Sequence, residues 1–163
     1  MVHILARMRV LLTGMSGAGK SSLVAELRRR GHEAYDADDD GFSEPRADGR
    51  WGRRADRVAD LLARHADRPL FFAGCSEEQG ALRFDYRVLL TAPRSLLIER
   101  LRTRTTNGYG RGDAELAQVL ADLDAVEPLL RRSADLVLMT TAPPPQLADT
   151  LLARVAELDA GAA

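Results

Sequence analysis

The chain has 163 residues, of which 45% are hydrophobic and 29% are charged, and its formal net charge is -1. This length suits one domain with a sizeable core, and the composition is that of a globular protein, which excludes disordered and fibrous classes. The balanced charge gives no sign of affinity for nucleic acid or a membrane surface, because binding to such polyanions needs a basic excess.

Location can also be inferred from the composition. No apolar run approaches the roughly 20 residues of a membrane span, and the first residues lack a signal-peptide pattern. The only cysteine, Cys75, cannot form an internal disulfide, which fits a reducing compartment. We therefore expect one domain over residues 1–163 in the cytoplasm. Met1 and Met8 are alternative starts, and with the second start residues 1–7 would be an N-terminal extension.

Strand and helix patterns alternate in the first part of the chain. Arg9–Thr13 is an apolar run that predicts a strand, and Ser21–Arg30 has the apolar spacing of a helix. His32–Asp36 predicts a weak second strand. Residues 41–52 are polar and rich in Gly and Pro, which predicts a mobile connection to a helix around Leu61.

The alternation continues after that helix. Pro69–Ala73 and Tyr86–Thr91 are continuous apolar runs of strand length. Pro93 suits the first turn of a helix that runs to about Arg104. Residues 105–112 are rich in glycine, which predicts a flexible segment between two helices.

The last part of the chain adds one strand and two helices. Asp113 is an N-cap candidate for a long helix, and Asp135–Met139 predicts a fifth strand. A final helix is expected over about 145–158, before a small-residue tail at 160–163 that should fray. No internal repeat or domain linker is evident.

These elements predict an α/β fold. Apolar strands that alternate with helices imply βαβ crossovers, so we expect a five-stranded parallel sheet with helices on both faces. Ligands of such sheets bind beyond the carboxyl ends of the strands. Gly14, Asp36, Gly74 and Thr91 all fall at such ends.

A phosphate-binding motif lies between the first strand and the first helix. Residues 14–21 read GMSGAGKS, which satisfies G-x-x-x-x-G-K-[ST] in the context that the motif requires. The glycines let successive N–H groups point at phosphate oxygens, and the helix N-terminus adds its dipole. Lys20 would bridge the terminal phosphates, and the Ser21 hydroxyl would hold Mg²⁺. The residues expected to bind the nucleotide here are Gly14, Met15, Ser16, Gly17, Ala18, Gly19, Lys20, Ser21 and Ser22.

Lysine usage narrows the class of phosphate-loop protein. Lys20 is the only lysine among 23 basic residues, all the others being arginine. In such an arginine-rich chain a retained lysine indicates a place where a compact ammonium is needed. A common GTPase would need a second lysine to read guanine, so that class is disfavoured. Motor-type ATPases usually have an acidic residue after an apolar strand, and the third strand is followed by none before Glu77.

The glycine spacing of this loop and the sequence Tyr35-Asp36-Ala37-Asp38 resemble the small-molecule and nucleoside-monophosphate kinases of the P-loop superfamily. Shikimate kinase, gluconate kinase and adenylate kinase are branches of that superfamily. The resemblance implies that Asp36 helps to order Mg²⁺ and its waters, and that Asp38 positions or deprotonates the acceptor hydroxyl. The alternative for the acidic residues Asp36, Asp38, Asp39 and Asp40 is a solvated turn.

The arginines of the third predicted helix also resemble the family. The resemblance implies that 105–112 is a short lid, that Arg100 lies on the adenine side and that Arg104 stabilises the transferring phosphoryl group. Arg102 and Arg111 are competitors for these roles, and an ordinary Arg-rich surface helix is the alternative.

The acceptor site is implied only by position in the family pattern. Gly74, Cys75 and Gln79 follow the third strand where the shikimate branch has a substrate loop, and Arg54 is a candidate ligand at the second helix. Cys75 has the alternative of a small buried residue. Glu127 stands near where shikimate kinases have an arginine for the substrate carboxylate. This departure puts shikimate in doubt and favours a hydroxyl-rich or cationic acceptor.

Together these observations predict a kinase that uses ATP and Mg²⁺. The acceptor would be a small molecule, such as a nucleoside, a nucleoside monophosphate, a polyol acid or an amino sugar. We expect a monomer with no nucleic-acid or membrane partner. The main alternative is a nucleotide-responsive binding protein with incidental hydrolysis, and a slow stand-alone NTPase is a weaker one.

Overall fold

A five-stranded sheet lies at the centre of the computed structural model, which describes residues 8–37, 41–45, 47–49, 51–64, 68–74, 84–103 and 110–162. All its strands are parallel, and their order is β2-β5-β1-β6-β7. The strands are β1 (Arg9–Thr13), β2 (Glu33–Asp36), β5 (Leu70–Ala73), β6 (Tyr86–Thr91) and β7 (Leu136–Met139). The predicted parallel sheet is confirmed, and β1 takes its central position.

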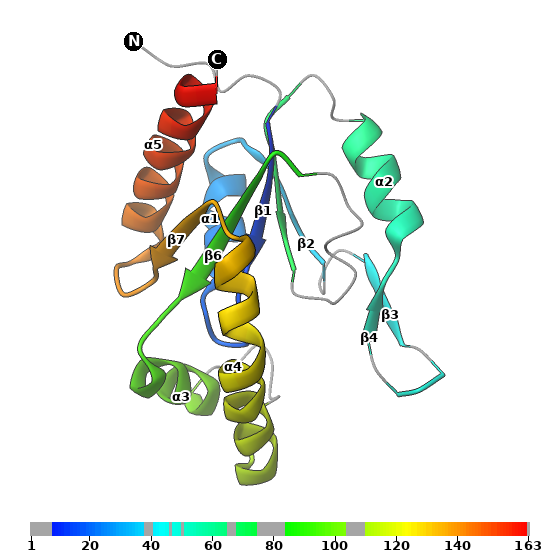
Figure 1. Cartoon of the computed structure of the whole chain (residues 1–163), viewed down its shortest axis with the longest axis vertical. Helices are drawn as coiled ribbons and strands as arrows, with labels where there is room; N and C mark the ends of the chain where they lie inside the picture. Colours follow the sequence, from blue (N-terminus) through cyan, green and yellow to red (C-terminus); the bar gives the residue numbers. More distant parts are fainter. Residues whose placement is uncertain are drawn as a thin grey trace.

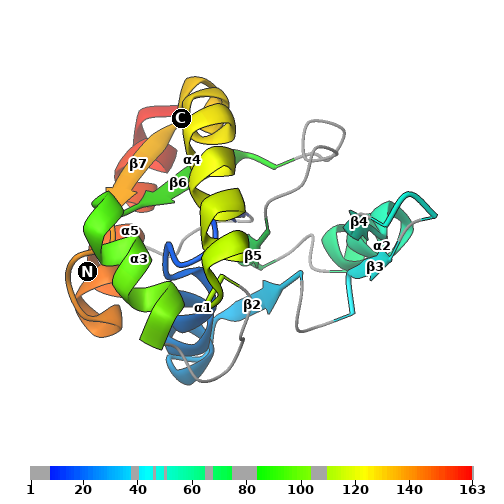
Figure 2. The same cartoon turned by 90° about the horizontal axis from the view of Figure 1, so that it is seen from below.

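Helices cover both faces of this sheet (Figures 1 and 2). On one face lie α1 and α5, and on the other lie α4 and, beyond it, α2. The helices are α1 (Lys20–Arg29), α2 (Ala55–Arg64), α3 (Arg94–Thr103), α4 (Asp113–Ser133) and α5 (Pro144–Ala162). Among the described residues, none of the helices combines the length and the apolar character needed to cross a membrane.

The central strands are apolar throughout because both of their faces are buried. Successive side chains of a strand point to opposite faces. Val10 and Leu12 of β1 accordingly pack in the cluster that includes α1 and α5, whereas Leu11 packs with Phe72 and the inner face of α2. Because side chains alternate in this way, the last residues of each strand can be assigned to one face of the sheet or the other.

Residues 41–53 differ from the expected mobile connection. They hold an antiparallel pair, β3 (Ser43–Pro45) and β4 (Trp51–Arg53), in which Pro45 pairs with Trp51. Gly49 has a φ of 80°, which the turn between the two strands uses and which few other residues adopt. Strands of three residues are too short to show alternation in a polar sequence, so the pattern missed them.

One expected helix end is also corrected. Asp113 is the first residue of α4, and the cap position belongs to Gly112, which makes no side-chain capping bond. α5 continues to Ala162, so residues 160–162 of the expected tail are helical. Of the expected lid at 105–112, only residues 110–112 lie within the described part of the chain.

A buried carboxylate on α1 holds the arginine that joins α1 to α5. Glu26 is 8% exposed and accepts hydrogen bonds from Arg29 (2.6 and 2.9 Å) and from Arg30 (2.9 Å). Arg30 in turn donates to Asp149 (2.6 Å) and to the carbonyl of Pro145 (2.8 Å) on α5. The hydrogen bonds from Arg29 and Arg30 lower the pKa of Glu26 from 4.5 to about 2. The helix that follows the phosphate loop is thereby fixed to its neighbour.

This lowered pKa predicts a pH-dependent stability. A carboxyl group that is more acidic in the folded state stabilises the fold above its unfolded pKa, and this contribution is lost as protons bind. We expect Glu26→Gln to have a lower Tm than the native protein at neutral pH. The difference should shrink as the pH falls from about 4.5 towards about 2. Thermal unfolding across this range measures it.

A matched control is Glu157→Gln, because Glu157 belongs to an exposed ion pair with Arg154 on α5. Exposed ion pairs contribute little to the free energy of unfolding, so the Tm of Glu157→Gln should follow that of the native protein at every pH. A constant gap between Glu26→Gln and the native protein at every pH would contradict the interpretation.

Candidate nucleotide-binding site

The predicted phosphate loop connects β1 to α1 at the carboxyl edge of the sheet. A Cβ atom at Gly14 would lie 2.5 Å from the carbonyl oxygen of Leu90, so only glycine allows the loop to pack this closely on β6. Gly19 occupies the N-cap of α1 with a φ of 98°, and no side chain caps the helix there. Phosphate sites of this kind use the first N–H groups of the helix that follows the loop, which here begins at Lys20.

Lys20 lies across this loop. Its Nζ donates to the carbonyl oxygens of Gly14 (2.5 Å) and Met15 (3.1 Å). The only ammonium side chain of the protein is thus placed at the loop whose N–H groups would hold phosphate. A flexible stem lets the ammonium leave these carbonyls and follow a bound phosphate group.

Ser21 and Asp36 meet beside the loop. The Ser21 hydroxyl, in the first turn of α1, donates to Oδ2 of Asp36 over 2.6 Å. Asp36 is the last residue of β2 and is 6% exposed. The structure thus brings together the two residues that the sequence proposed for the metal. Their oxygen atoms fit Mg²⁺, which binds to few protein ligands and keeps waters and phosphate oxygens as the others.

No three acidic, cysteine or histidine side chains gather into a metal-binding group within the described ranges. A metal at this place would therefore depend on phosphate oxygens as well as on Ser21 and Asp36. That dependence is usual for Mg²⁺ bound together with a nucleotide.

A hydrogen-bond network under the loop was not foreseen from the sequence. Thr140, which follows β7, has no exposed surface, and its hydroxyl donates to the carbonyl of Ala18 over 2.6 Å. The same hydroxyl lies 3.2 Å from the carbonyl of Thr91, which also accepts the Thr140 backbone N–H over 2.8 Å. Thr140 thereby joins the loop to the ends of β6 and β7. Its position directly after an apolar strand is the signal that could have identified it.

Arg100 of α3 completes this network. Its guanidinium donates to the carbonyl of Gly17 (3.1 Å), to the hydroxyl of Thr140 (3.0 Å) and to the Thr140 carbonyl. Partial burial lowers its pKa, but an arginine stays charged at neutral pH. The structure therefore places a cation against the phosphate loop, on the side of β7.

The other predicted residues lie in several places. Gly74 is buried at the end of β5, where its N–H donates to the Leu12 carbonyl (3.0 Å), so it lies beside β1 at the carboxyl edge. Arg54, at the start of α2, forms ion pairs with Glu44 (3.7 Å) and Asp56 (3.4 Å). Arg102 is exposed and pairs with Asp113. Arg111 is exposed before α4, and the expectations at Asp38, Cys75, Gln79 and Arg104 lie outside the described residues.

An open hollow of about 690 Å³ lies beside α2. Its lining in the described part of the chain includes none of the loop residues and consists of Phe42, Arg57, Asp60, Ala63 and Arg64. The chemistry-bearing residues lie instead at the ends of β1, β2 and β6. We therefore take the phosphate loop as the candidate site.

The Thr140 hydroxyl offers a direct test of the network. In Thr140→Val the shape is kept, but the Ala18 carbonyl and one Arg100 N–H lose a partner. We expect the free energy of unfolding to fall by about 1–3 kcal/mol and nucleotide affinity to fall with it. Chemical denaturation and nucleotide titration measure the two effects.

Thr141 is exposed and serves as the control position. Thr141→Val should change the free energy of unfolding by less than about 0.5 kcal/mol. If both variants behaved alike, the role of the buried hydroxyl in holding the loop would have to be abandoned.

Comparisons with solved structures identify proteins that share this fold. A shikimate kinase from Acinetobacter baumannii, in complex with shikimate, superposes with a TM-score of 0.66 at 20% identity, covering 91% of this chain and 92% of that one. A gluconokinase from Sinorhizobium meliloti superposes with a TM-score of 0.61 at 20% identity, covering 93% of each chain. These identities establish a shared fold, which confirms the predicted resemblance at that level.

The sequence itself gives a second line of comparison. None of the curated proteins matches it significantly. A family model described as AAA domain matches residues 10–121, a range that includes the phosphate loop, Asp36 and Arg100. Because this match spans more than half of the chain, the protein belongs to the AAA domain family.

Proposed function

We propose that this protein is a kinase that transfers the γ-phosphoryl group of ATP to a small-molecule acceptor in the presence of Mg²⁺. The observation that carries the proposal is the contact between Ser21 and Asp36 beside a phosphate loop whose only ammonium is Lys20. Such a site can hold phosphate and metal together. The fold shared with a shikimate kinase and a gluconokinase supports a phosphoryl-transfer enzyme of this type.

The loop residues would act on the phosphates of ATP. N–H groups of residues 14–19 and of the start of α1 donate to the β- and γ-phosphate oxygens, and the dipole of α1 adds a favourable field. Lys20 pairs with the same oxygens as a point charge. Because phosphoryl transfer needs little covalent help from the protein, positioning and charge neutralisation account for most of the catalysis.

Ser21 and Asp36 would hold the metal. A bound Mg²⁺ would supply positive charge to offset the charge that develops on the phosphates during transfer. The Ser21 hydroxyl can turn from Asp36 to the metal, and Asp36 can then hold the metal's waters by hydrogen bonds. The buried position of Asp36 at the end of β2 fixes the direction of its carboxylate.

Arginines would contribute on the other side of the loop. Arg100 is tied to Gly17 and Thr140, and we assign it to the adenine side of the nucleotide. Arg104 follows α3 directly in the sequence, and we assign it to the transferring phosphoryl group, with 105–112 as the lid. Water exclusion by a lid would limit hydrolysis of ATP without transfer.

The acceptor would lie next to Asp38, which we assign as the group that positions or deprotonates its hydroxyl. Gly74, at the end of β5, leaves room for close approach of the acceptor, and Cys75, Gln79 and Arg54 are further candidate contacts. Nucleosides, nucleoside monophosphates, polyol acids and amino sugars are the acceptor classes to test. We expect the enzyme to act as a monomer in the cytoplasm.

The first test is direct transfer. Purified protein with Mg²⁺ and γ-labelled ATP should move label into one class of acceptor offered in separate pools. Lys20→Ala should lower this rate by about 10²–10³-fold or more, because transition-state charge loses its partner. Lys20→Arg should also be impaired, since a planar guanidinium does not replace a compact ammonium. Label released only as inorganic phosphate would contradict the kinase and favour a slow NTPase.

Two aspartate variants separate a kinase from a nucleotide-responsive binding protein. Asp38→Asn should lower kcat by about 10²–10⁴-fold with little change in ATP affinity. Asp36→Asn should instead raise the Mg²⁺ concentration needed for half-maximal rate by about 10–100-fold, as loss of a carboxylate behind the metal does. Steady-state kinetics at varied Mg²⁺ measures both. A binding protein would show no acceptor-dependent turnover to lose, and Asp38→Asn would leave its nucleotide response unchanged.

A further inference from the structure

A shielded carboxylate lies over the end of β6, next to the phosphate loop. The hydroxyl of Thr91, the last residue of β6, donates to Oε1 of Glu127 on α4 over 2.5 Å. Glu127 has 15% of its side chain exposed. The proposed reaction as described above gives it no role.

The position of Thr91 places Glu127 beside the nucleotide site. Leu90, the preceding residue, has the carbonyl against which Gly14 packs. The Thr91 carbonyl accepts from Thr140, whose hydroxyl holds the loop at Ala18. Glu127 is therefore one hydrogen bond away from the framework that supports the loop.

The face of the sheet that α4 covers is polar at the carboxyl ends of its strands. Leu12, Ala73 and Leu90 pack in the cluster with α1 and α5. Because side chains alternate, the next residues of these strands belong to the opposite face, which α4 covers. Those next residues are Thr13, Gly74 and Thr91. A small polar molecule that reaches the loop along this edge would meet two hydroxyl-bearing residues, a glycine and the carboxylate of Glu127.

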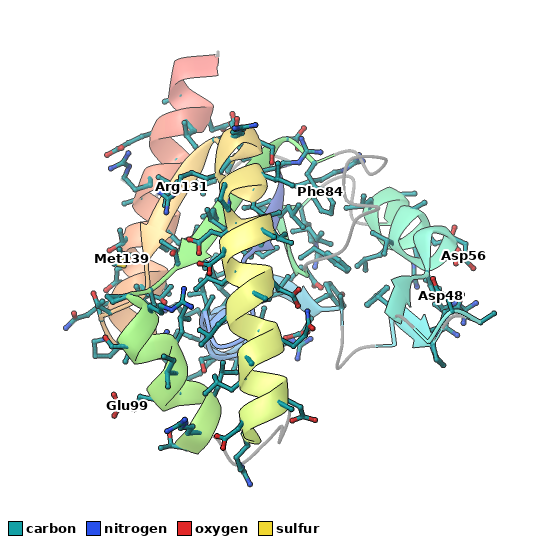
Figure 3. The ribbon with its side chains drawn as sticks, turned by 60° about the horizontal axis from the view of Figure 1, so that its bottom comes forward. Asp48, Asp56, Phe84, Glu99, Arg131 and Met139 are labelled. Atoms are coloured by element: carbon teal, nitrogen blue, oxygen red, sulfur yellow. The ribbon has the colours of Figure 1, made fainter. Side chains whose placement is uncertain are left out.

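The charge of Glu127 is only partly balanced. Besides Thr91, its partner is Arg131, at 3.4 Å from the same Oε1 atom. Arg131 is 53% exposed, and it lies near the carboxyl end of α4, on the opposite side of the view from Asp56 of α2 (Figure 3). Such a long, exposed pair contributes little. No described residue donates to the second oxygen, Oε2. Shielding a carboxylate costs free energy that further hydrogen bonds offset, so a donor to Oε2 would be favourable.

We propose that Glu127 selects an acceptor that carries a primary ammonium group, such as an amino alcohol or an amino sugar. The inference rests on the proposed kinase function. The ammonium donates to Oε2 of Glu127 and is not itself changed. An acceptor carboxylate at the same place would be repelled, so sugar acids are poor substrates.

The transfer step is the ordinary one. The acceptor hydroxyl oxygen forms a bond to the γ-phosphorus, and the bond from this phosphorus to the β,γ-bridging oxygen breaks. ADP leaves with the electron pair of that bond, and the hydroxyl proton passes to Asp38. Glu127 fixes which hydroxyl faces the γ-phosphate, because it holds the other end of the acceptor.

Matched acceptors test this inference. One set is D-glucosamine, D-glucose and D-gluconate, and the other is ethanolamine, ethylene glycol and glycolate. With Mg²⁺ and ATP we expect the highest kcat/KM for the amine of each set and the lowest for the acid. Glu127→Gln should lower kcat/KM for the amine by about 10–100-fold, the usual loss when a charged hydrogen bond is removed, and should change the neutral member little.

Thr91→Val is the matched control. It removes the hydrogen bond that joins α4 to β6 but keeps the carboxylate, so the preference for amines should remain. Glu127→Gln keeps an oxygen that can accept from Thr91, so its fold should persist. If Glu127 only braced α4, Thr91→Val would lower the free energy of unfolding and neither variant would change the preference.

The outcomes distinguish the two proposals. Preference of the native protein for gluconate or glycolate would overturn the role of Glu127 and leave the kinase intact. If no acceptor in either set turned over, calorimetric titration of D-glucosamine in the presence of ADP would decide. Binding that is lost in Glu127→Gln supports the inference, and absence of binding to the native protein overturns it. Failure of transfer in every acceptor pool would count against the kinase itself.

Discussion

The hydroxyl of Thr140 holds the phosphate loop to the end of the sheet, and the candidate site depends on this contact. A loop rich in glycine has few side chains with which to fix itself, and its backbone gains conformational entropy whenever it is released. One buried hydroxyl binds the Ala18 carbonyl and lies against Thr91, while the backbone of Gly14 packs on Leu90. With the loop so placed, Lys20 and Ser21 have little freedom left except the rotation of their own side chains.

The order of the strands explains why distant segments meet at this loop. Because β1 lies between β5 and β6, its carboxyl end is adjacent to residues that follow each neighbouring strand. The first turn of α1 reaches Asp36 on β2, and the loop reaches Thr140 after β7. The salt bridges of Glu26 and Arg30 then fix α1 to α5 behind the sheet. The helix that presents Ser21 is thus held at its far end by charge and at its start by the sheet.

Sequence reasoning succeeded where the determining contacts are local or follow from strand direction. The GMSGAGKS motif is recognised from eight consecutive residues. The contact between Ser21 and Asp36 follows once both are placed at the carboxyl edge of a parallel sheet. Thr140 and Glu127 gain their roles from partners that are far away in the chain, namely Ala18 and Thr91. The β3–β4 pair was missed because a three-residue strand has no readable period. Asp113 was misplaced by one position, since an acidic residue favours both the cap and the first turn of a helix.

Positive and negative side chains lie on different sides of the candidate site. Lys20 and Arg100 both donate to loop carbonyls, so positive charge gathers where a polyphosphate would bind. Glu127 places negative charge over the adjacent end of β6. A nucleotide would be drawn to the first region and repelled from the second, and a cationic acceptor would behave in the reverse way. Since fields in a partly buried site are weakly screened, this separation would sort the proposed donor from the proposed acceptor before either makes its specific hydrogen bonds. An acceptor that carried a carboxylate would gain no such guidance, because it would compete with ATP for the same cations.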